Sequence, residues 1–292
     1  MTHLRPSHSP VHPSRRNFIK GCAAAAGIAA LPGGISMALA TPSNAVGLQL
    51  YTLRDMMAVS VPATLKLVAA VGYKELEFAG YYGHTPEEIN AMMQEEGLTA
   101  PSAHIPLTEF EKGIEPIIEA AKTLSHNYLV VPYLTEAQRG TKIDTYYKLA
   151  ERMNIWGEAC RKEGIQLAYH NHDFEFEERD NEMPYDVLLN ETQPDNVKME
   201  LDLYWTVKAG QDPLSLFSKH AGRFPLWHVK DMDKEGAFAD VGTGEIDFTP
   251  IFAAASKAGL QHAFVERDMT NDRVKTIQQG YKAVSSLLTQ KG

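Results

Sequence analysis

Histidine and carboxylate side chains stand at the ends of four short apolar runs: LAYHNHDF at 167–174, MELDLYW at 199–205, LWHVKD at 226–231 and FVERD at 264–268. A mixture of imidazole and carboxylate ligands suits zinc, manganese and related divalent cations. If these runs are neighbouring strands of one barrel, their ends meet at the same mouth. The sequence therefore predicts one metal centre, with candidate ligands His170, His172, Asp202, His228 and Glu266.

The elements that would position these residues alternate regularly between strand-like and helix-like patterns. Strands are expected at Val46–Leu53, Glu75–Phe78, Leu98–His104, Tyr128–Val131, Gln166–His170, Val197–Asp202, Phe224–Lys230 and Ala263–Arg267. Helical spacing of apolar residues is clearest at 62–72, 86–97, 143–164, 250–259 and 274–288. This alternation predicts an α/β protein with a single (β/α)8 TIM barrel over residues 41–292. An open doubly wound sheet is the alternative, but no glycine-rich dinucleotide-binding motif follows the first strand.

Alternation of side chains along a strand orders the candidates by depth. Glu200 and Asp202 share one face of the sixth strand, and Asp202 is preferred as the ligand because it lies nearer the strand end. Glu200 is then expected deeper, where it either orients a histidine or forms a buried ion pair. His170 and His172 share a face only if the chain stays extended past the fifth strand, so substrate contact is the alternative for His172.

The seventh and eighth strands supply the remaining candidates for chemistry. Lys230 is in phase with His228, so its ammonium could stabilise a developing oxyanion or bind a sugar oxygen. Asp231 is out of phase and is expected to cap the following loop. Glu266 closes the apolar run HAFVE and is expected to have a role in the site.

Four further residues are candidate substrate contacts. Glu77 and His104 stand at the ends of the second and third strands, with a role as satisfied buried polar groups as the alternative. Tyr51 and Trp205 are aromatic residues near strand ends, and aromatic rings pack on the apolar face of a pyranose.

The first 40 residues have the pattern of an export signal rather than of the barrel. The segment Ser14–Lys20 resembles a twin-arginine motif, a weakly apolar Ala/Gly stretch follows it, and Ala38-Leu39-Ala40 fits a cleavage site. An ordinary basic N-terminus or a membrane anchor is the alternative, although the apolar stretch is short and broken for a bilayer span. We expect a periplasmic or otherwise exported protein, with no stable membrane insertion after cleavage.

Charge limits the class of partner. The first 40 residues hold four of the 28 basic residues and none of the 37 acidic ones, so the remaining 252 residues carry a formal charge of −13. This charge repels nucleic acid and anionic membrane surfaces at a distance. A neutral small molecule is the expected partner, and the sequence leaves homo-oligomerisation open.

Five motifs together resemble the sugar phosphate isomerase/epimerase family, the xylose-isomerase-like barrels. They are YHNHDFEF at 169–176, ELDLYWTVKAGQDP at 200–213, HVKDM at 228–232, VGTGEIDF at 241–248 and VERD at 265–268. The resemblance implies one divalent ion, preferably manganese, with zinc, magnesium or cobalt as alternatives. The epimerases of this family hold it with Glu, Asp, His and Glu. Asp202, His228 and Glu266 match three of these positions, whereas His170 stands at the fourth.

The resemblance implies a metal-dependent isomerase or epimerase that acts on a sugar or ketosugar through an enediolate. Glu266 would be the base, Lys230 the oxyanion partner, and His170 or His172 could replace the missing second glutamate. The same enediolate would expel a leaving group β to the carbonyl, so a ketoglycoside lyase or hydrolase is an alternative. A non-catalytic sugar-binding protein is another. An endonuclease-like phosphodiesterase is disfavoured, since it would need more zinc ligands and a basic DNA-binding face.

Overall fold

Eight parallel strands close into a barrel because β1 pairs with both β2 and β10. The computed structural model describes residues 43–289, so the predicted export signal over residues 1–40 lies outside the described residues. The barrel strands are β1 (Gly47–Gln49), β2 (Glu75–Phe78), β3 (Thr99–His104), β4 (Tyr128–Val131), β5 (Gln166–His170), β6 (Val197–Asp202), β7 (Leu226–Val229) and β10 (His262–Val265). The prediction of a single (β/α)8 barrel is confirmed.

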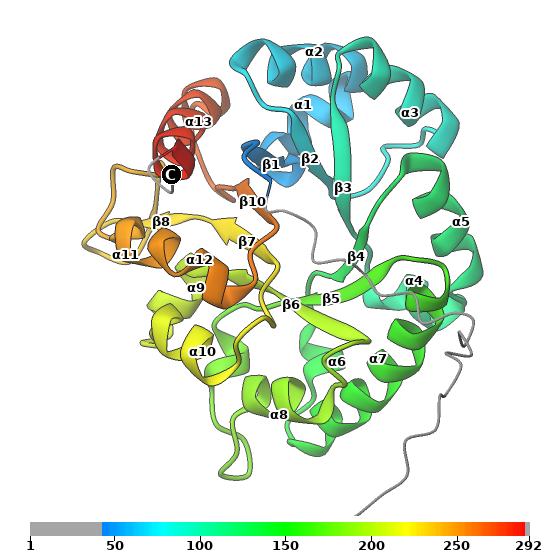
Figure 1. Cartoon of the computed structure of the whole chain (residues 1–292), viewed down its shortest axis with the longest axis vertical. Helices are drawn as coiled ribbons and strands as arrows, with labels where there is room; N and C mark the ends of the chain where they lie inside the picture. The colour runs from blue at the N-terminus through cyan, green and yellow to red at the C-terminus, as the bar shows by residue number, and fades with distance from the viewer. Residues whose placement is uncertain (1–42, 290–292) are drawn as a thin grey trace, which may run out of the picture. The chain divides into compact units, whose positions relative to one another are not determined.

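Helices surround the strands (Figure 1). They are α1 (Arg54–Val59), α2 (Val61–Val71), α3 (Pro86–Glu95), α4 (Leu107–Lys112), α5 (Glu115–Leu124), α6 (Glu136–Arg139), α7 (Asp144–Lys162), α8 (Pro184–Glu191), α9 (Leu203–Lys208), α10 (Pro213–Lys219), α11 (Phe248–Ala253), α12 (Ala255–Ala258) and α13 (Arg273–Thr289). Two 3-10 turns, η1 (Leu50–Leu53) and η2 (Phe174–Phe176), and a small hairpin of β8 (Asp231–Met232) and β9 (Phe238–Ala239) complete the fold. Gly259 ends α12 with a positive φ of 84°, a conformation that glycine adopts without strain.

Four strands differ in their bounds from the prediction: the third begins one residue later, at Thr99, the seventh is shorter at both ends, with Lys230 just beyond β7, and the first and eighth differ as follows. The first strand was expected over Val46–Leu53, but β1 ends at Gln49, because the Gln49 side chain accepts a hydrogen bond from the Tyr51 N–H and turns the chain into η1. The eighth barrel strand ends at Val265, so Glu266 follows the strand rather than lying inside it. The predicted helix 250–259 begins earlier and is divided into α11 and α12, with Asp247 capping its start.

The barrel interior changes from apolar to polar along its axis. A small buried cluster of Val130, Ala168, Leu226 and Phe264 fills one level of the interior. His228 follows Leu226 on the same face of β7, and Lys230 comes directly after the end of this strand, so the polar level lies toward the carboxyl ends. The out-of-phase Trp227 instead packs outside the barrel against Phe217, with ring centroids 5.1 Å apart.

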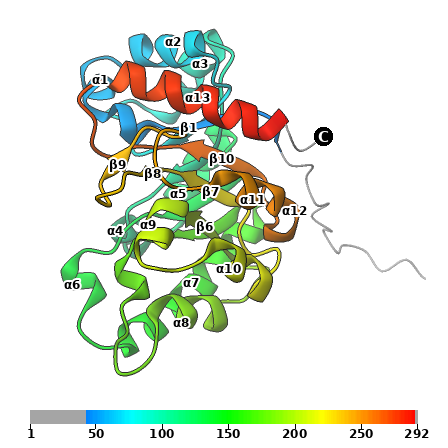
Figure 2. The same cartoon turned by 90° about the vertical axis from the view of Figure 1, so that its left-hand side faces the viewer.

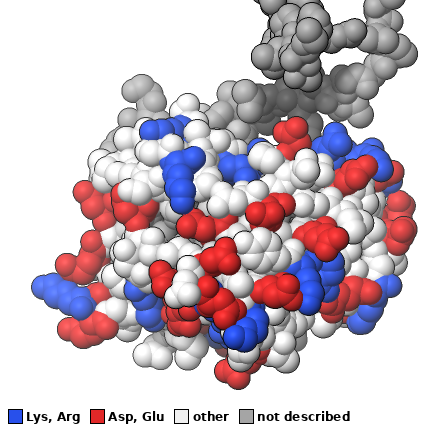
Figure 3. Space-filling view, turned by 90° about the horizontal axis from the view of Figure 1, so that it is seen from below, with Lys and Arg blue, Asp and Glu red and all other residues white. Residues whose placement is uncertain are grey.

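The segments that follow the carboxyl ends of the strands lie on one side of the barrel. Figure 2 shows α1, the β8–β9 hairpin, α4 and α6 along its left-hand edge. One face of the molecule shows acidic and basic side chains interspersed (Figure 3). Among residues 43–289, no helix has the length and apolar character needed to cross a bilayer.

Candidate functional site

The predicted ligands converge at the carboxyl ends of the strands. Possible ligand atoms of Asp202, His228 and Glu266 all lie within 4.8 Å of one another, and all three side chains are buried. The strand register produces this convergence, because Asp202 on β6 pairs directly with His228 on β7. Glu266 joins them from the end of β10, where its backbone N–H donates to the Val229 carbonyl.

Asp202 uses its two carboxylate oxygens differently. Its Oδ1 accepts a hydrogen bond from the Trp205 N–H at 2.9 Å and thereby caps α9. Its Oδ2 is buried and lies 3.0 Å from the Lys230 ammonium, on the side of the other candidate ligands. Burial raises the pKa of Asp202 to about 6, although the nearby Lys230 ammonium opposes this shift. The carboxylate is therefore held in place by one oxygen while the other remains available as a ligand.

The donor set fits a divalent cation. Asp202 Oδ2, His228 Nδ1 and Glu266 Oε2 are buried and face one another, and the two carboxylate oxygens lie 3.0 and 2.6 Å from the Lys230 ammonium. Buried carboxylates require positive charge close by, and two carboxylates with an imidazole are a ligand set that a divalent cation accepts. The His170 Nε2 lies 3.7 Å from Asp202 Oδ2, and burial lowers the pKa of His170, which keeps its ring neutral as a metal ligand requires.

Lys230 is surrounded by carboxylates. Its Nζ lies 2.6 Å from Glu266 Oε2, 2.9 Å from Asp268 Oδ1 and 3.0 Å from Asp202 Oδ2. Burial alone would lower the pKa of this ammonium, but the three carboxylates raise it well above its usual range. Burial likewise opposes ionisation of Glu266, whose pKa is nevertheless lowered by Lys230 and His228. Lys230 is therefore a positively charged neighbour of an ionised Glu266.

A second group lies beside the first and shares His228. Its members are His104, His170, Glu200 and His228, whose possible ligand atoms are also within 4.8 Å of one another. Within it, His104 Nε2 contacts Glu200 Oε2 at 2.7 Å in a direct hydrogen bond. Burial lowers the pKa of His104, but the carboxylates of Glu77 and Glu200 raise it more, to about 9. The second group holds one carboxylate and three imidazoles, whereas the first holds two carboxylates and one imidazole.

Glu77 is fully buried at this deeper level. Its Oε1 accepts a hydrogen bond from Ser102 at 2.5 Å, and its Oε2 accepts one from Gln49 at 2.6 Å. The His228 Nε2 lies 2.6 Å from the same Oε2. Both oxygens of Glu77 are thus occupied by protein groups, as in a satisfied buried polar residue.

The other predicted contacts lie around the cluster rather than within it. His172 stacks on Phe174 and approaches the rings of Trp205 and Tyr133, with centroids 5.0 to 5.4 Å apart. Burial lowers the pKa of His172 well below its usual value, and its Nδ1 has no hydrogen-bond partner in the described part of the chain. Tyr51 is 43% exposed and packs beneath the Arg54 guanidinium.

Two residues that support the site were not singled out from the sequence. Asp268 pairs with Lys230; its only signal is that it follows Glu266 by two positions. Glu175 is fully buried, accepts hydrogen bonds from the Tyr169 hydroxyl and the His172 N–H, and has its pKa raised by burial to about 8.

The prediction that Asp231 caps the following loop is confirmed. Its carboxylate accepts hydrogen bonds from the N–H groups of Gly242, Gly244 and Ile246. The carboxylate therefore organises residues 242–246 next to the strand that carries His228 and Lys230.

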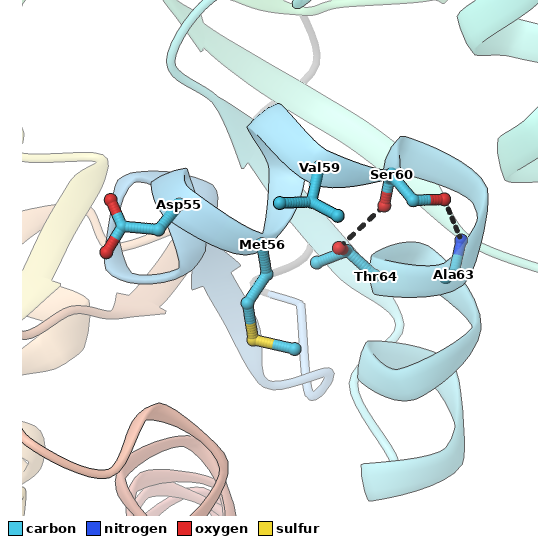
Figure 4. Close-up of a pocket in the computed structure, with 6 residues that line it drawn as sticks. All are labelled: Asp55, Met56, Val59, Ser60, Ala63 and Thr64. Atoms are coloured by element: carbon cyan, nitrogen blue, oxygen red, sulfur yellow. Dashed lines mark hydrogen bonds between the residues drawn. The ribbon is translucent and has the colours of Figure 1, made fainter.

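A surface pocket between α1 and α2 offers a contrast (Figure 4). Its volume is about 380 Å³, and it is lined by Asp55, Met56, Val59, Ser60, Ala63 and Thr64. The Ser60 hydroxyl accepts a hydrogen bond from the Ala63 N–H, and the Thr64 hydroxyl donates one to the Ser60 carbonyl, both at the start of α2. The Asp55 carboxylate pairs with Arg273. The residues that line this pocket therefore do not include the converging histidine and carboxylate side chains found at the barrel mouth.

Comparison with known proteins agrees with this architecture. The profile of the family described as "Xylose isomerase-like TIM barrel" matches residues 65–287. Inosose dehydratases of Lacticaseibacillus casei and Geobacillus thermodenitrificans are each 30% identical over 134 and 135 residues. These matches cover 40% of this chain and only 44% and 45% of those relatives.

Solved structures cover more of the chain. A sugar phosphate isomerase/epimerase from Parabacteroides distasonis has a TM-score of 0.71 and 26% identity, covering 86% of this chain and 97% of its own. The IOLI protein, solved with a bound zinc atom, has a TM-score of 0.65 and covers 85% of this chain and 99% of its own. At 15% identity, that second likeness concerns the fold alone.

Proposed function

The chain belongs to the xylose isomerase-like TIM barrel family, and from this premise we propose that it is a metal-dependent lyase acting on a ketosugar or ketoglycoside. The reaction would be β-elimination: a proton leaves the carbon next to the ketone, and an oxygen substituent leaves the following carbon. The observation that carries the proposal is the contact of 2.6 Å between Lys230 Nζ and Glu266 Oε2, which puts an acid beside a base.

The metal centre would be formed by Asp202, His228 and Glu266, with His170 as the fourth ligand. A divalent cation bound there would polarise the substrate ketone and so acidify the neighbouring C–H bond. Manganese is our first choice, with zinc, magnesium and cobalt as alternatives.

The proton balance follows from the residues around this centre. Glu266 is ionised and accepts the α-proton, and the C–H electron pair becomes the enediolate. The ketone C=O bond then re-forms, the electron pair moves into a new C=C bond between the α- and β-carbons, and the C–O bond to the leaving group breaks. Lys230 gives a proton to the departing oxygen and regains one from the neighbouring Glu266 carboxyl, so both groups return to their starting states. Asp202 and Asp268 keep the ammonium in place throughout.

Residues at the rim would bind the sugar. Trp205 offers an aromatic face, and its indole N–H has no hydrogen-bond partner among residues 43–289. His172 is neutral and offers an unpaired Nδ1 to a substrate hydroxyl. The matched segments of inosose dehydratases support elimination from a cyclic ketone, although the match spans less than half of those proteins.

Isomerisation or epimerisation of a sugar is the second candidate, favoured by the 26% identity with the Parabacteroides distasonis protein over 86% of this chain. Epimerisation needs proton exchange on two faces of one carbon. Elimination needs only one base and a nearby acid, which is why the Glu266–Lys230 contact favours it.

The test uses the metal-loaded protein and a ketoglycoside with a chromogenic aglycone. The wild type should release the aglycone, and a chelator should stop the release. Glu266→Gln and Lys230→Met should each lower kcat by about 10²- to 10⁴-fold, the usual range for removing a proton-transfer group. Glu95→Gln, an exposed carboxylate on α3, is the matched control. Rearranged ketosugar without aglycone release would instead support the isomerase.

We also propose that residues 1–40 direct export by the twin-arginine route, as the Arg15-Arg16 pair suggests. Changing both arginines to lysine should trap the full-length chain inside the cell. Export of this variant at the wild-type level would contradict the proposal.

A further inference from the structure

His228 stands between two carboxylate systems, one on each side of its ring. Its Nδ1 lies 2.8 Å from Glu266 Oε2 at the proposed metal centre. Its Nε2 lies 2.6 Å from Glu77 Oε2 in the deeper layer. A histidine that binds a cation through one nitrogen carries its remaining proton on the other. The group that faces Nε2 therefore decides whether Nδ1 is free to bind.

A chain of hydrogen bonds determines that Glu77 acts as a hydrogen-bond acceptor toward Nε2 of His228. The Tyr51 backbone N–H can only donate, and it donates to Gln49 Oε1 at 2.9 Å. The amide of Gln49 is thereby oriented with its NH2 group toward Glu77 Oε2, at 2.6 Å. Since Glu77 Oε2 already receives one donor, it acts as an acceptor there, and His228 Nε2 at 2.6 Å lies closer to it than His104 Nε2 at 3.2 Å.

The other carboxylates near His228 are less suited to this task. Glu200 Oε2 lies 3.2 Å from His228 Nε2, against 2.6 Å for Glu77, and is already hydrogen-bonded to His104. Glu77 is also fixed on its far side, where Ser102 donates to Oε1 at 2.5 Å. Glu77 is 0% exposed, so water does not compete for its oxygens.

We propose that Glu77 is a positioning residue, which holds the Nε2–H tautomer of His228 and so presents Nδ1 to the cation bound by Asp202 and Glu266. This inference rests on the metal centre of the proposed function. Partners of this kind, beyond the ligands themselves, typically change metal affinity by about 10- to 100-fold when they are removed.

The conservative variant is Glu77→Gln. Both Gln49 and His228 donate toward the Oε2 position, so the new amide oxygen should lie there and its NH2 group should face the Ser102 hydroxyl, which can accept. The tautomer is then preserved, but the charge-assisted hydrogen bond is replaced by a weaker neutral one. Glu77→Met removes the acceptor altogether while keeping an unbranched side chain of similar length.

The experiment measures Zn²⁺ affinity of the purified chain by calorimetry, together with ¹⁵N–¹H NMR of the histidine rings in the Zn²⁺-loaded protein. Wild-type His228, assigned by the loss of its signals in His228→Gln, should show Nε2–H and a metal-bound Nδ1. Glu77→Met should weaken Zn²⁺ binding by about 10- to 100-fold, and Glu77→Gln should recover most of that loss. Ser102→Ala is the matched control, since it removes a hydrogen bond from the other oxygen of Glu77, and should change affinity less than threefold.

The outcomes separate two failures. If wild-type protein fails to bind Zn²⁺ and the other candidate cations, the proposed metal centre is wrong. If it binds Zn²⁺ through Nε2 of His228, or if Glu77→Gln and Ser102→Ala weaken binding equally, the metal centre stands and the role of Glu77 is refuted. The wild-type NMR measurement decides even if Glu77→Met does not fold.

Discussion

Replacing Lys230 by methionine tests the charge balance of the site without any substrate. The Lys230 side chain is 2% exposed, and its three carboxylate partners lie 2.6 to 3.0 Å away. Two unit charges about 3 Å apart attract by roughly 5 to 6 kcal/mol at an effective dielectric constant of 20, before the cost of dehydrating them is subtracted. Removing one partner of such a buried cluster leaves uncompensated charge and typically costs about 3 to 5 kcal/mol.

We therefore expect Lys230→Met to lower the free energy of unfolding of the metal-free protein by about 3 to 5 kcal/mol. A divalent cation should narrow this difference, because it supplies positive charge to Asp202 and Glu266 in place of the ammonium. Ligand at 100 times its dissociation constant stabilises a folded protein by about 2.7 kcal/mol, and the variant should gain more than the wild type because its carboxylates are unpaired.

Urea denaturation followed by circular dichroism, with a chelator and with saturating Mn²⁺, measures both effects. Lys66→Met is the matched control, since Lys66 is an exposed lysine on α2 and its loss should cost within about 0.5 kcal/mol. Equal stability of Lys230→Met and wild type in chelator would refute the reasoning. So would a difference that Mn²⁺ leaves unchanged.

Two further changes test the supporting residues. Burial raises the pKa of Glu175 to about 8, so between about pH 5 and 8 the folded state holds a proton that the unfolded state has released, and stability falls as pH rises. Glu175→Gln can keep the hydrogen bonds to Tyr169 and His172. In urea titrations across that pH range, this variant should reduce the dependence of stability on pH by up to about 1.4 kcal/mol per pH unit. An unchanged dependence would contradict the raised pKa of Glu175. Asp231→Asn turns one acceptor oxygen into a donor facing backbone N–H groups such as that of Gly242, so thermal unfolding should show a loss of about 1 to 3 kcal/mol and hydrogen exchange at 242–246 should accelerate; protection equal to wild type would disprove the loop-capping role.

Much of the barrel could be predicted from the sequence because several of its strands, such as YLVV at 128–131, are apolar runs between helical segments. The expected bounds of Glu75–Phe78, Tyr128–Val131, Gln166–His170 and Val197–Asp202 agree with the structure. Parallel strands buried on both faces have this composition, and helices at regular intervals leave few alternatives to a closed barrel.

The site was predictable where a strand fixes the direction of a side chain. Asp202 and His228 lie within strands, and alternation places them at one level. Asp268 lies beyond the end of β10, where no periodicity applies, and its direction is set by Lys230 across the barrel mouth. The hydrogen bond from Gln49 to Glu77 likewise joins two strands, so only the closed barrel reveals it.

The double use of Asp202 links the choice of metal to folding. One oxygen of Asp202 caps the start of α9, and the other faces the proposed cation. A substitution that removes this ligand therefore also removes a helix cap that stabilises the fold by about 1 kcal/mol. Asparagine can accept the same cap hydrogen bond, but it brings no charge to the cation. His170 does not cap a helix, since it is the last residue of β5. Attempts to retune this protein for a different ion should therefore exchange His170 and leave Asp202 untouched.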